Sequence, residues 1–131
     1  MKPEKPYNGA TWTSARFASF IKSALRAASR RWPQKHEALK KACVGKRINK
    51  ATGKDIFHYK CAACANLFKA VGVQVDHINP VVSVEKGFEG WDVYIERMFC
   101  EADGYQVLCK PCHAIKTANE RKARKGNKDE D

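Results

Sequence analysis

Cys61-Ala-Ala-Cys64 and Cys109-Lys-Pro-Cys112-His113 enclose the stretch that decides the fold of this chain, with Val73-Gln-Val-Asp-His-Ile-Asn-Pro80 between them. A Cys-x-x-Cys pair forms a tight knuckle that directs two thiolates at one tetrahedral ion. Two such pairs predict a zinc site formed by four residues: Cys61, Cys64, Cys109 and Cys112. Because the pairs lie far apart in the sequence, we expect a substantial insertion between them. We also expect the zinc to be structural and the chemistry to lie within the insertion.

The insertion offers a carboxylate and an imidazole side by side, Asp76 and His77, at the end of a run in which valines alternate with other residues. A second histidine, His113, follows the second knuckle directly. A neutral imidazole is a suitable base near neutral pH, and a carboxylate with an imidazole suits a hard divalent ion. Less specific interpretations stay open. A lone Asp-His pair is common, and a histidine after Cys-x-x-Cys could be a ligand in a Cys3His zinc site or a helix-start residue.

Several short motifs occur in a fixed order: Cys61-x-x-Cys64, Val75-Asp76-His77-Ile78-x-Pro80, Gln106-x-Leu108-Cys109-x-x-Cys112-His113 and Lys116-Thr117. This ordered set resembles the HNH endonuclease family, the ββα-metal nucleases, and especially the small zinc-ribbon versions found in phage genomes. The resemblance covers roughly residues 57–120. One position departs from the family pattern, because the central Asn of the family falls on Gly104.

The resemblance implies an α+β fold, in which a small ββα-metal core is stapled by the four-cysteine zinc site. It implies hydrolysis of DNA phosphodiester bonds, by nicking or double-strand cleavage, leaving a 5′-phosphate and a 3′-hydroxyl. His77 would be the general base, and Asp76 and His113 would hold a single catalytic Mg²⁺ or Mn²⁺. Lys116 and Thr117 would contact the substrate backbone. Double-stranded DNA is the implied partner, with phage packaging or replication proteins as further candidates.

Charge is distributed unevenly along the chain. Residues 1–60 contain 15 Lys and Arg against 3 Asp and Glu, whereas residues 61–131 contain 10 against 11. A basic half beside a neutral half indicates a polyanion-binding arm attached to a working domain. We expect DNA contacts from one helical face, through Arg16, Lys22, Arg26, Arg30 and Arg31. The alternative is a solvated basic surface without a partner.

Hydrophobic periodicity predicts helices from Ser14, over 33–43, over 89–101 and from Cys112, and strands over 56–60, 71–78 and 105–109. Residues 1–12 are predicted to be extended, 46–54 to be a basic loop and 66–72 to be a turn. Three helices have predicted core faces: Phe17, Phe20, Ile21, Ala24, Leu25 and Ala28 in the first, Trp91, Ile95, Met98 and Phe99 in the third, and Ala114, Ile115 and Ala118 in the last. The predicted regions are a basic helical DNA-binding region (1–56), the nuclease core (57–120) and a charged flexible tail (121–131).

Cellular location bears on the cysteines. No apolar run is long enough to span a bilayer, and the first residues lack the apolar segment of a signal peptide. We therefore expect no membrane partner and a cytoplasmic chain (in the host cell, if the protein is phage-encoded). Thiols stay reduced there, which favours metal over disulfides for the Cys-x-x-Cys pairs. Cys43 and Cys100 are interpreted as bystander thiols.

The glycine at position 104 leaves two functional alternatives. A glycine tolerates the positive φ that Asn often adopts, and Asp103 could supply the missing side-chain hydrogen bond, so the nuclease could stay active. The rival is a non-catalytic zinc-ribbon nucleic-acid-binding module with a degenerate site. An interaction subunit of a phage packaging or replication machine is compatible with either.

Overall fold

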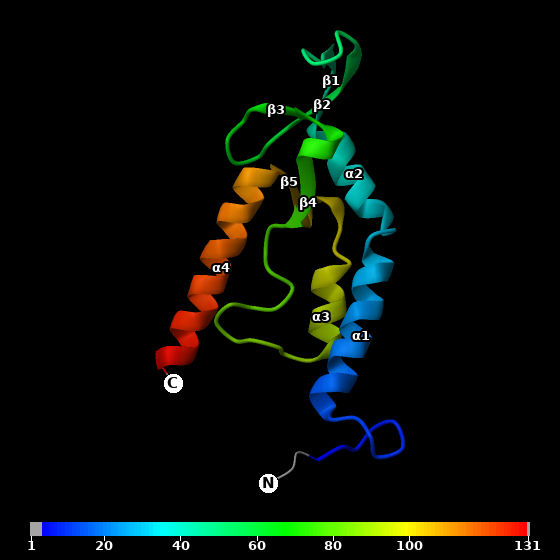
Figure 1. Cartoon of the computed structure of the whole chain (residues 1–131), viewed down its shortest axis with the longest axis vertical. Coiled ribbons are helices and arrows are strands. Elements are labelled where there is room, and N and C mark those ends of the chain that lie inside the picture. Colours follow the sequence, from blue (N-terminus) through cyan, green and yellow to red (C-terminus); the bar gives the residue numbers. More distant parts are fainter. Residues whose placement is uncertain (1–3, 131) are drawn as a thin grey trace. The chain divides into compact units, whose positions relative to one another are not determined.

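The computed structural model describes residues 4–130, and the side chains of residues 4–126 (Figure 1). The chain divides into two compact units between Trp32 and Pro33. Trp32 precedes Pro33, and a residue before proline avoids the α-helical backbone conformation. The helix of the first unit therefore stops before the helix that begins at Pro33. The second unit thus includes residues 33–56, which the sequence analysis grouped with the basic N-terminal region.

The first unit consists of α1 (Ser14–Ser29) and the turn before it. The Thr13 hydroxyl caps α1 by accepting a hydrogen bond from the Arg16 amide at 3.1 Å, so the predicted helix start is confirmed. Tyr7 and Trp12 pair across a turn instead of lying in an extended segment, and the Tyr7 ring stacks on Phe17 at 4.1 Å. Phe20, predicted to be in the core, is 58% exposed.

The second unit mixes helices with two small sheets and contains the four-cysteine cluster, as expected for the α+β prediction. Its elements are α2 (Pro33–Ala42), β1 (Cys43–Ile48), β2 (Asp55–Lys60), β3 (Leu67–Lys69), η1 (Ala70–Gly72), β4 (Val73–His77), α3 (Trp91–Met98), η2 (Ala102–Gly104), β5 (Tyr105–Cys109) and α4 (Lys110–Glu130). β1, β2 and β3 form one antiparallel sheet, and β4 pairs with β5 in the other. The predicted loop 46–54 and turn 66–72 are partly wrong, because β1 ends within the first stretch and β3 lies within the second.

β5 is the central element of the second unit. Tyr105, Val107, Leu108 and Cys109 are all buried, and the strand pairs with β4 in the register Asp76 opposite Gln106 and His77 opposite Tyr105. α2 packs against β5 and η2. The Gln34 side chain accepts a hydrogen bond from the Ala102 amide at 3.1 Å. The strand predicted over 105–109 is therefore confirmed with its bounds.

The core face predicted for α3 needs one correction. Tyr94 and Met98 are buried, whereas Ile95 is 43% exposed. The helix is shorter than predicted, and the Tyr94 ring packs edge-on against Trp91 at 5.7 Å. Aromatic packing on this side turns Ile95 outward.

α4 presents a polar face to the rest of its unit. The predicted inner residues Ala114, Ile115 and Ala118 are exposed, Ile115 by 62%. The covered positions are Cys112, His113, Lys116, Glu120 and Arg124. Because the knuckle fixes Cys112 inward, the 3.6-residue period brings these positions inward too. The helix continues through the predicted tail to Glu130, and none of the helices in the described residues has the length and apolarity needed to cross a membrane.

Candidate functional site

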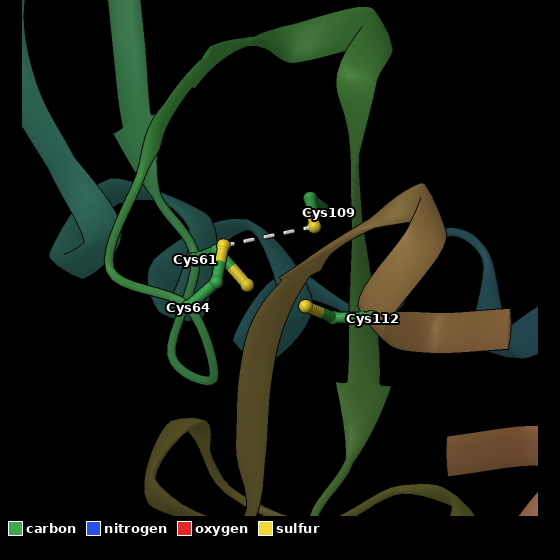
Figure 2. A group of neighbouring side chains, drawn as sticks. All are labelled: Cys61, Cys64, Cys109 and Cys112. Carbon is green, nitrogen blue, oxygen red and sulfur yellow. Dashed lines mark hydrogen bonds between the residues drawn. The ribbon is translucent and has the colours of Figure 1, made fainter. Parts of the chain in front are cut away.

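The four knuckle cysteines converge on one point (Figure 2). Cys61 and Cys64 follow β2, Cys109 ends β5 and Cys112 lies in the first turn of α4. Their sulfur atoms all lie within 4.8 Å of one another, and the Cys64 and Cys109 sulfurs are 3.9 Å apart. A tetrahedral zinc site with Zn–S bonds of about 2.3 Å needs sulfur atoms about 3.8 Å apart. The cluster could therefore hold a metal such as zinc.

Main-chain hydrogen bonds shape the first knuckle and attach it to β5. The Ala65 amide donates to the Cys61 carbonyl at 2.9 Å, and Ala65 has a φ of +64°. The Cys61 amide donates to the Asn66 carbonyl at 3.0 Å. The Ala62 amide donates to the Val107 carbonyl at 2.8 Å, which holds the first pair of cysteines beside the second. Backbone hydrogen bonds thus hold the four cysteines together.

The electrostatics of the cluster favour a bound cation. Burial alone would raise the pKa of the Cys61 thiol, but main-chain amides of Cys64, Cys109 and Ala63 lower it to about 6. The pKa of Cys112 is raised to about 12, first by the neighbouring Cys109 thiol and then by burial. One thiolate is therefore supported by the protein, whereas a full set of four requires a positive ion to balance the charge.

Asp76 and His113 lie together, on β4 and α4. His113 Nε2 is 3.5 Å from Asp76 Oδ1, and both side chains are mostly covered. Lys116 Nζ lies 2.9 Å from Asp76 Oδ2, and the Gln106 side-chain amide donates to the same oxygen at 3.3 Å. The family resemblance implies that Asp76 and His113 share one metal ion, whereas it implies no role for Gln106.

Lys116 points inward to this group rather than outward, and Thr117 beside it is exposed. The Lys116 ammonium also pairs with Glu120 and donates to the His77 main-chain carbonyl at 3.0 Å. Burial would lower the pKa of Lys116, but hydrogen bonds to Glu120 and Asp76 raise it above its usual value. Sequence reasoning missed Glu120, although its position four residues after Lys116 is the spacing of helical ion pairs.

The His77 imidazole hydrogen-bonds to a main-chain carbonyl and not to the Asp76 carboxylate. Its Nε2 is 2.9 Å from the Met98 carbonyl oxygen, and its ring is 4.8 Å from the Tyr105 ring. The Tyr105 hydroxyl donates to the same carbonyl at 2.7 Å. Burial lowers the pKa of His77, so the ring is neutral near pH 7. Neighbouring residues of a strand point to opposite faces, which explains why only the main chain of His77 meets Lys116.

Gly104 has a different structural role from the one expected. Its φ is not positive, and a Cβ atom at this position would lie 2.6 Å from the Cys100 sulfur. Its carbonyl accepts a hydrogen bond from the Ile78 amide at 3.0 Å. The exposed Asp103 carboxylate has no hydrogen-bond partner within residues 4–126. The expectation that Asp103 supplies the hydrogen bond of the missing Asn side chain is therefore wrong. Close packing against Cys100 explains the glycine.

The basic residues predicted to bind DNA on this helical face all belong to the first unit: Arg16, Lys22 and Arg26 lie on α1, and Arg30 and Arg31 follow its last residue, Ser29. Arg16, Arg26, Arg30 and Arg31 are exposed, whereas Lys22 is partly covered. The Arg16 guanidinium lies over the Trp12 ring at 4.6 Å. Four of the five side chains are therefore accessible to a partner.

No protein-family model matches the chain, and no curated protein or solved structure is significantly similar to it. Within the described residues, the four cysteines are the only group of three or more His, Cys, Asp or Glu side chains close enough to share one metal. The Asp76–His113 pair offers only two metal-ligating side chains, and the Lys116 ammonium lies beside the Asp76 carboxylate.

Proposed function

We propose that the protein is a metal-dependent endonuclease of the HNH type that hydrolyses phosphodiester bonds in double-stranded DNA. The observation that carries the proposal is the 3.5 Å approach of His113 Nε2 to Asp76 Oδ1, immediately beside the second cysteine knuckle. Four cysteines would bind a structural zinc, and the knuckle would fix the start of α4, which bears His113. The carboxylate and the imidazole would then be held on two rigid elements.

Asp76 and His113 would hold the catalytic Mg²⁺ or Mn²⁺. The residues fit such an ion, because a carboxylate oxygen and an imidazole nitrogen converge there, and the Lys116 ammonium would have to move away from Asp76 to admit it. When bound, a hard divalent ion supplies Lewis acidity toward a phosphate oxygen. The side chains of His113 and Asp76 are 30% and 15% exposed, so the proposed site is partly open to solvent.

His77 would accept the proton from the attacking water. The Met98 carbonyl can only accept a hydrogen bond, so Nε2 carries the hydrogen in the neutral ring and Nδ1 keeps the lone pair. Because burial lowers the pKa of His77, this form predominates near pH 7. A neutral imidazole with a fixed tautomer has the properties of a general base.

Lys116 and Thr117 would contact the DNA backbone. The Lys116 ammonium neutralises Asp76 and Glu120, so its transfer to a phosphate requires another cation at Asp76. Glu120 would keep the Lys116 side chain near the site during that exchange. The proposed products are a 5′-phosphate and a 3′-hydroxyl.

The second candidate function is a non-catalytic zinc-ribbon module that binds nucleic acid. The specific observation in its favour is the Lys116–Asp76 ion pair, since it satisfies the carboxylate without a divalent ion. Gly104 in place of the family Asn agrees with this alternative. The two functions differ in one measurable property, which is cleavage.

The test is incubation of the purified protein with supercoiled plasmid and Mg²⁺ or Mn²⁺. We expect nicked or linear product that EDTA abolishes, with the zinc content measured alongside because EDTA also removes zinc. His77→Ala and Asp76→Ala should abolish cleavage, whereas His36→Ala, which removes an exposed imidazole on α2, should not. An inert parent protein with full zinc would contradict the nuclease and favour the binding module. Cleavage by His77→Ala at the parental rate would contradict the general-base role.

A further inference from the structure

A second candidate nucleic-acid surface involves none of the five basic residues predicted to bind DNA, and most of it falls within the predicted basic region 1–56. We name it the basic hairpin, residues 43–60, formed by β1, β2 and the turn between them. It extends away from the β4–β5 core of its unit (Figure 1). β2 leads directly into Cys61, so the ribbon is anchored to the first cysteine knuckle.

The turn of the basic hairpin is held by internal hydrogen bonds. The Asn49 amide donates to the Lys54 carbonyl at 2.8 Å, and the Gly53 amide donates to the Asn49 carbonyl at 2.7 Å. The Asn49 side chain also accepts from the Ala51 amide at 3.1 Å. Gly53 has a φ of +72°, which suits glycine. The tip of the ribbon is therefore structured before any partner arrives.

The charge of the basic hairpin is strongly positive. It contains one acidic residue, Asp55, and five exposed cations: Lys46, Arg47, Lys50, Lys54 and Lys60. Within the described part of the chain none of these cations pairs with a carboxylate. Nearby on β3, Lys69 is also exposed. Unpaired cations on a protruding ribbon are available to phosphates.

Exposed apolar side chains accompany the cations. Lys46 and Phe57 are directly opposite each other in the strand register, so they share one face, and the Lys46 ammonium lies 5.4 Å from the Phe57 ring. Phe57 is 53% exposed and Ile48 is 66% exposed. A pocket of about 300 Å³ adjoins this face, lined by Ile56, Phe57, Tyr59, Lys69, Ala70 and Val71. The face thus combines apolar area with positive charge.

We propose that the basic hairpin enters the major groove of duplex DNA. A two-stranded β-ribbon fits a major groove about 12 Å wide. The tip cations would contact phosphates, and Phe57 would meet base edges such as the thymine methyl group. This inference extends the proposed function, since it assigns a surface that holds the DNA substrate. The positive charge complements a nucleic acid, whereas an exposed apolar strip alone would not select one.

The experiment measures binding of a short labelled duplex by fluorescence anisotropy, in buffer without added divalent ion, so that cleavage plays no part. The test variant replaces four cations of the hairpin with Ala: Lys46, Arg47, Lys50 and Lys54. The matched control replaces four exposed cations of α4: Lys110, Arg121, Lys122 and Lys125. We expect the hairpin variant to bind about tenfold more weakly or worse, and its log–log salt slope to shrink by about 0.9 for each phosphate that it no longer neutralises. The affinity of the control should fall clearly less.

Two further readouts separate groove binding from general attraction. Phe57→Ala should weaken binding without changing the salt dependence, since the ring carries no charge. Methylation of guanine N7, which lies in the major groove, should interfere with binding by the parent but not by the hairpin variant. Unchanged zinc content in every variant would show that the fold is intact.

A hairpin variant that binds DNA like the α4 control would overturn the inference, as would a parent protein indifferent to N7 methylation. These outcomes are distinct from failure of the nuclease. A parent that binds through the hairpin but cuts no DNA with any divalent ion would refute the proposed function and support the hairpin. A parent that cuts DNA and binds it without the hairpin would support the proposed function and refute the hairpin inference.

Discussion

The Cys100 thiol occupies the space in which a side chain at Gly104 would begin. A Cβ atom on Gly104 would lie 2.6 Å from the Cys100 sulfur and 3.2 Å from the Cys100 Cβ. The main chain around Gly104 is held in place, because its carbonyl accepts a hydrogen bond from the Ile78 amide beyond the end of β4. Position 104 therefore connects η2 with the segment that follows Asp76 and His77, and it has no room for Asn.

Gly104→Asn should destabilise the protein rather than restore an active site. Overpacking of this kind costs about 1–3 kcal/mol in free energy of unfolding. Chemical denaturation of the variant measures this loss. Adding Cys100→Ala should recover part of it by removing the sulfur, whereas Cys43→Ala, at the other cysteine outside the knuckles, should recover none. A Gly104→Asn protein as stable as the parent would contradict the packing argument.

We expect one Zn²⁺ per chain, bound by the four knuckle cysteines. Cys109→Ser should lose most of the zinc and much of the folded structure, because in small zinc domains the free energy of metal binding is free energy of folding. Metal analysis and thermal unfolding monitored by circular dichroism measure the two effects. Cys43→Ser is the matched control, since Cys43 lies outside the cluster. Full zinc in the Cys109→Ser protein would refute the ligand assignment.

Lys116→Met should destabilise the zinc-loaded protein in the absence of Mg²⁺, because Asp76 and Glu120 would lose their shared cation. We expect a decrease of about 1–3 kcal/mol in free energy of unfolding, less than for a fully buried pair. Mg²⁺ should then raise the melting temperature of the variant more than that of the parent, because no ammonium competes for Asp76.

Lys110→Met, an exposed change on the same helix, is the control for this comparison. Equal stabilisation of Lys116→Met and the parent by Mg²⁺ would show that no divalent ion replaces the ammonium. Addition of Asp76→Asn to the Lys116→Met variant should abolish the extra response, since the carboxylate ligand is then missing.

The stability of the protein should fall as the pH drops below about 6.5, in part because of His77. Burial lowers the pKa of this imidazole in the folded state, so the unfolded chain binds the proton more readily. The contribution is fully present above the unfolded pKa of about 6.5 and is lost as the pH falls through the folded pKa. Unfolding free energies measured between about pH 8 and pH 5 should depend less on pH for His77→Gln than for the parent. A parent and a His77→Gln variant with the same pH dependence would contradict the shift, and His36→Gln is the control.

The sequence was most informative where a local pattern and the tertiary structure agree. The knuckle spacing located the cysteine cluster, and the alternation of valines with other residues located β4. Apolar periodicity likewise located α1. The juxtaposition of Asp76 with His113 agrees with what the family resemblance implied.

Other features depended on tertiary packing that no local pattern encodes. α4 has few apolar residues, so periodicity favoured Ile115 for its inner face, whereas the knuckle sets the helix phase and places Lys116 and Glu120 there. β1 follows α2 without a break, and its last three residues begin the stretch 46–54, whose cations favour a basic loop. Gly104 was interpreted through its backbone freedom, whereas its requirement comes from Cys100, four residues earlier.

The attachment of α4 to the second knuckle determines which changes in chain length the protein can absorb. One residue inserted between Cys112 and His113 would rotate the rest of the helix by about 100° and carry Lys116 and Glu120 away from Asp76. A residue inserted into the loop between β4 and α3 would have no such effect, since loop length costs little free energy. We expect the spacing from Cys109 to Glu120 to be fixed to the residue in any functional variant of this chain, while the loop after β4 is free to lengthen or shorten.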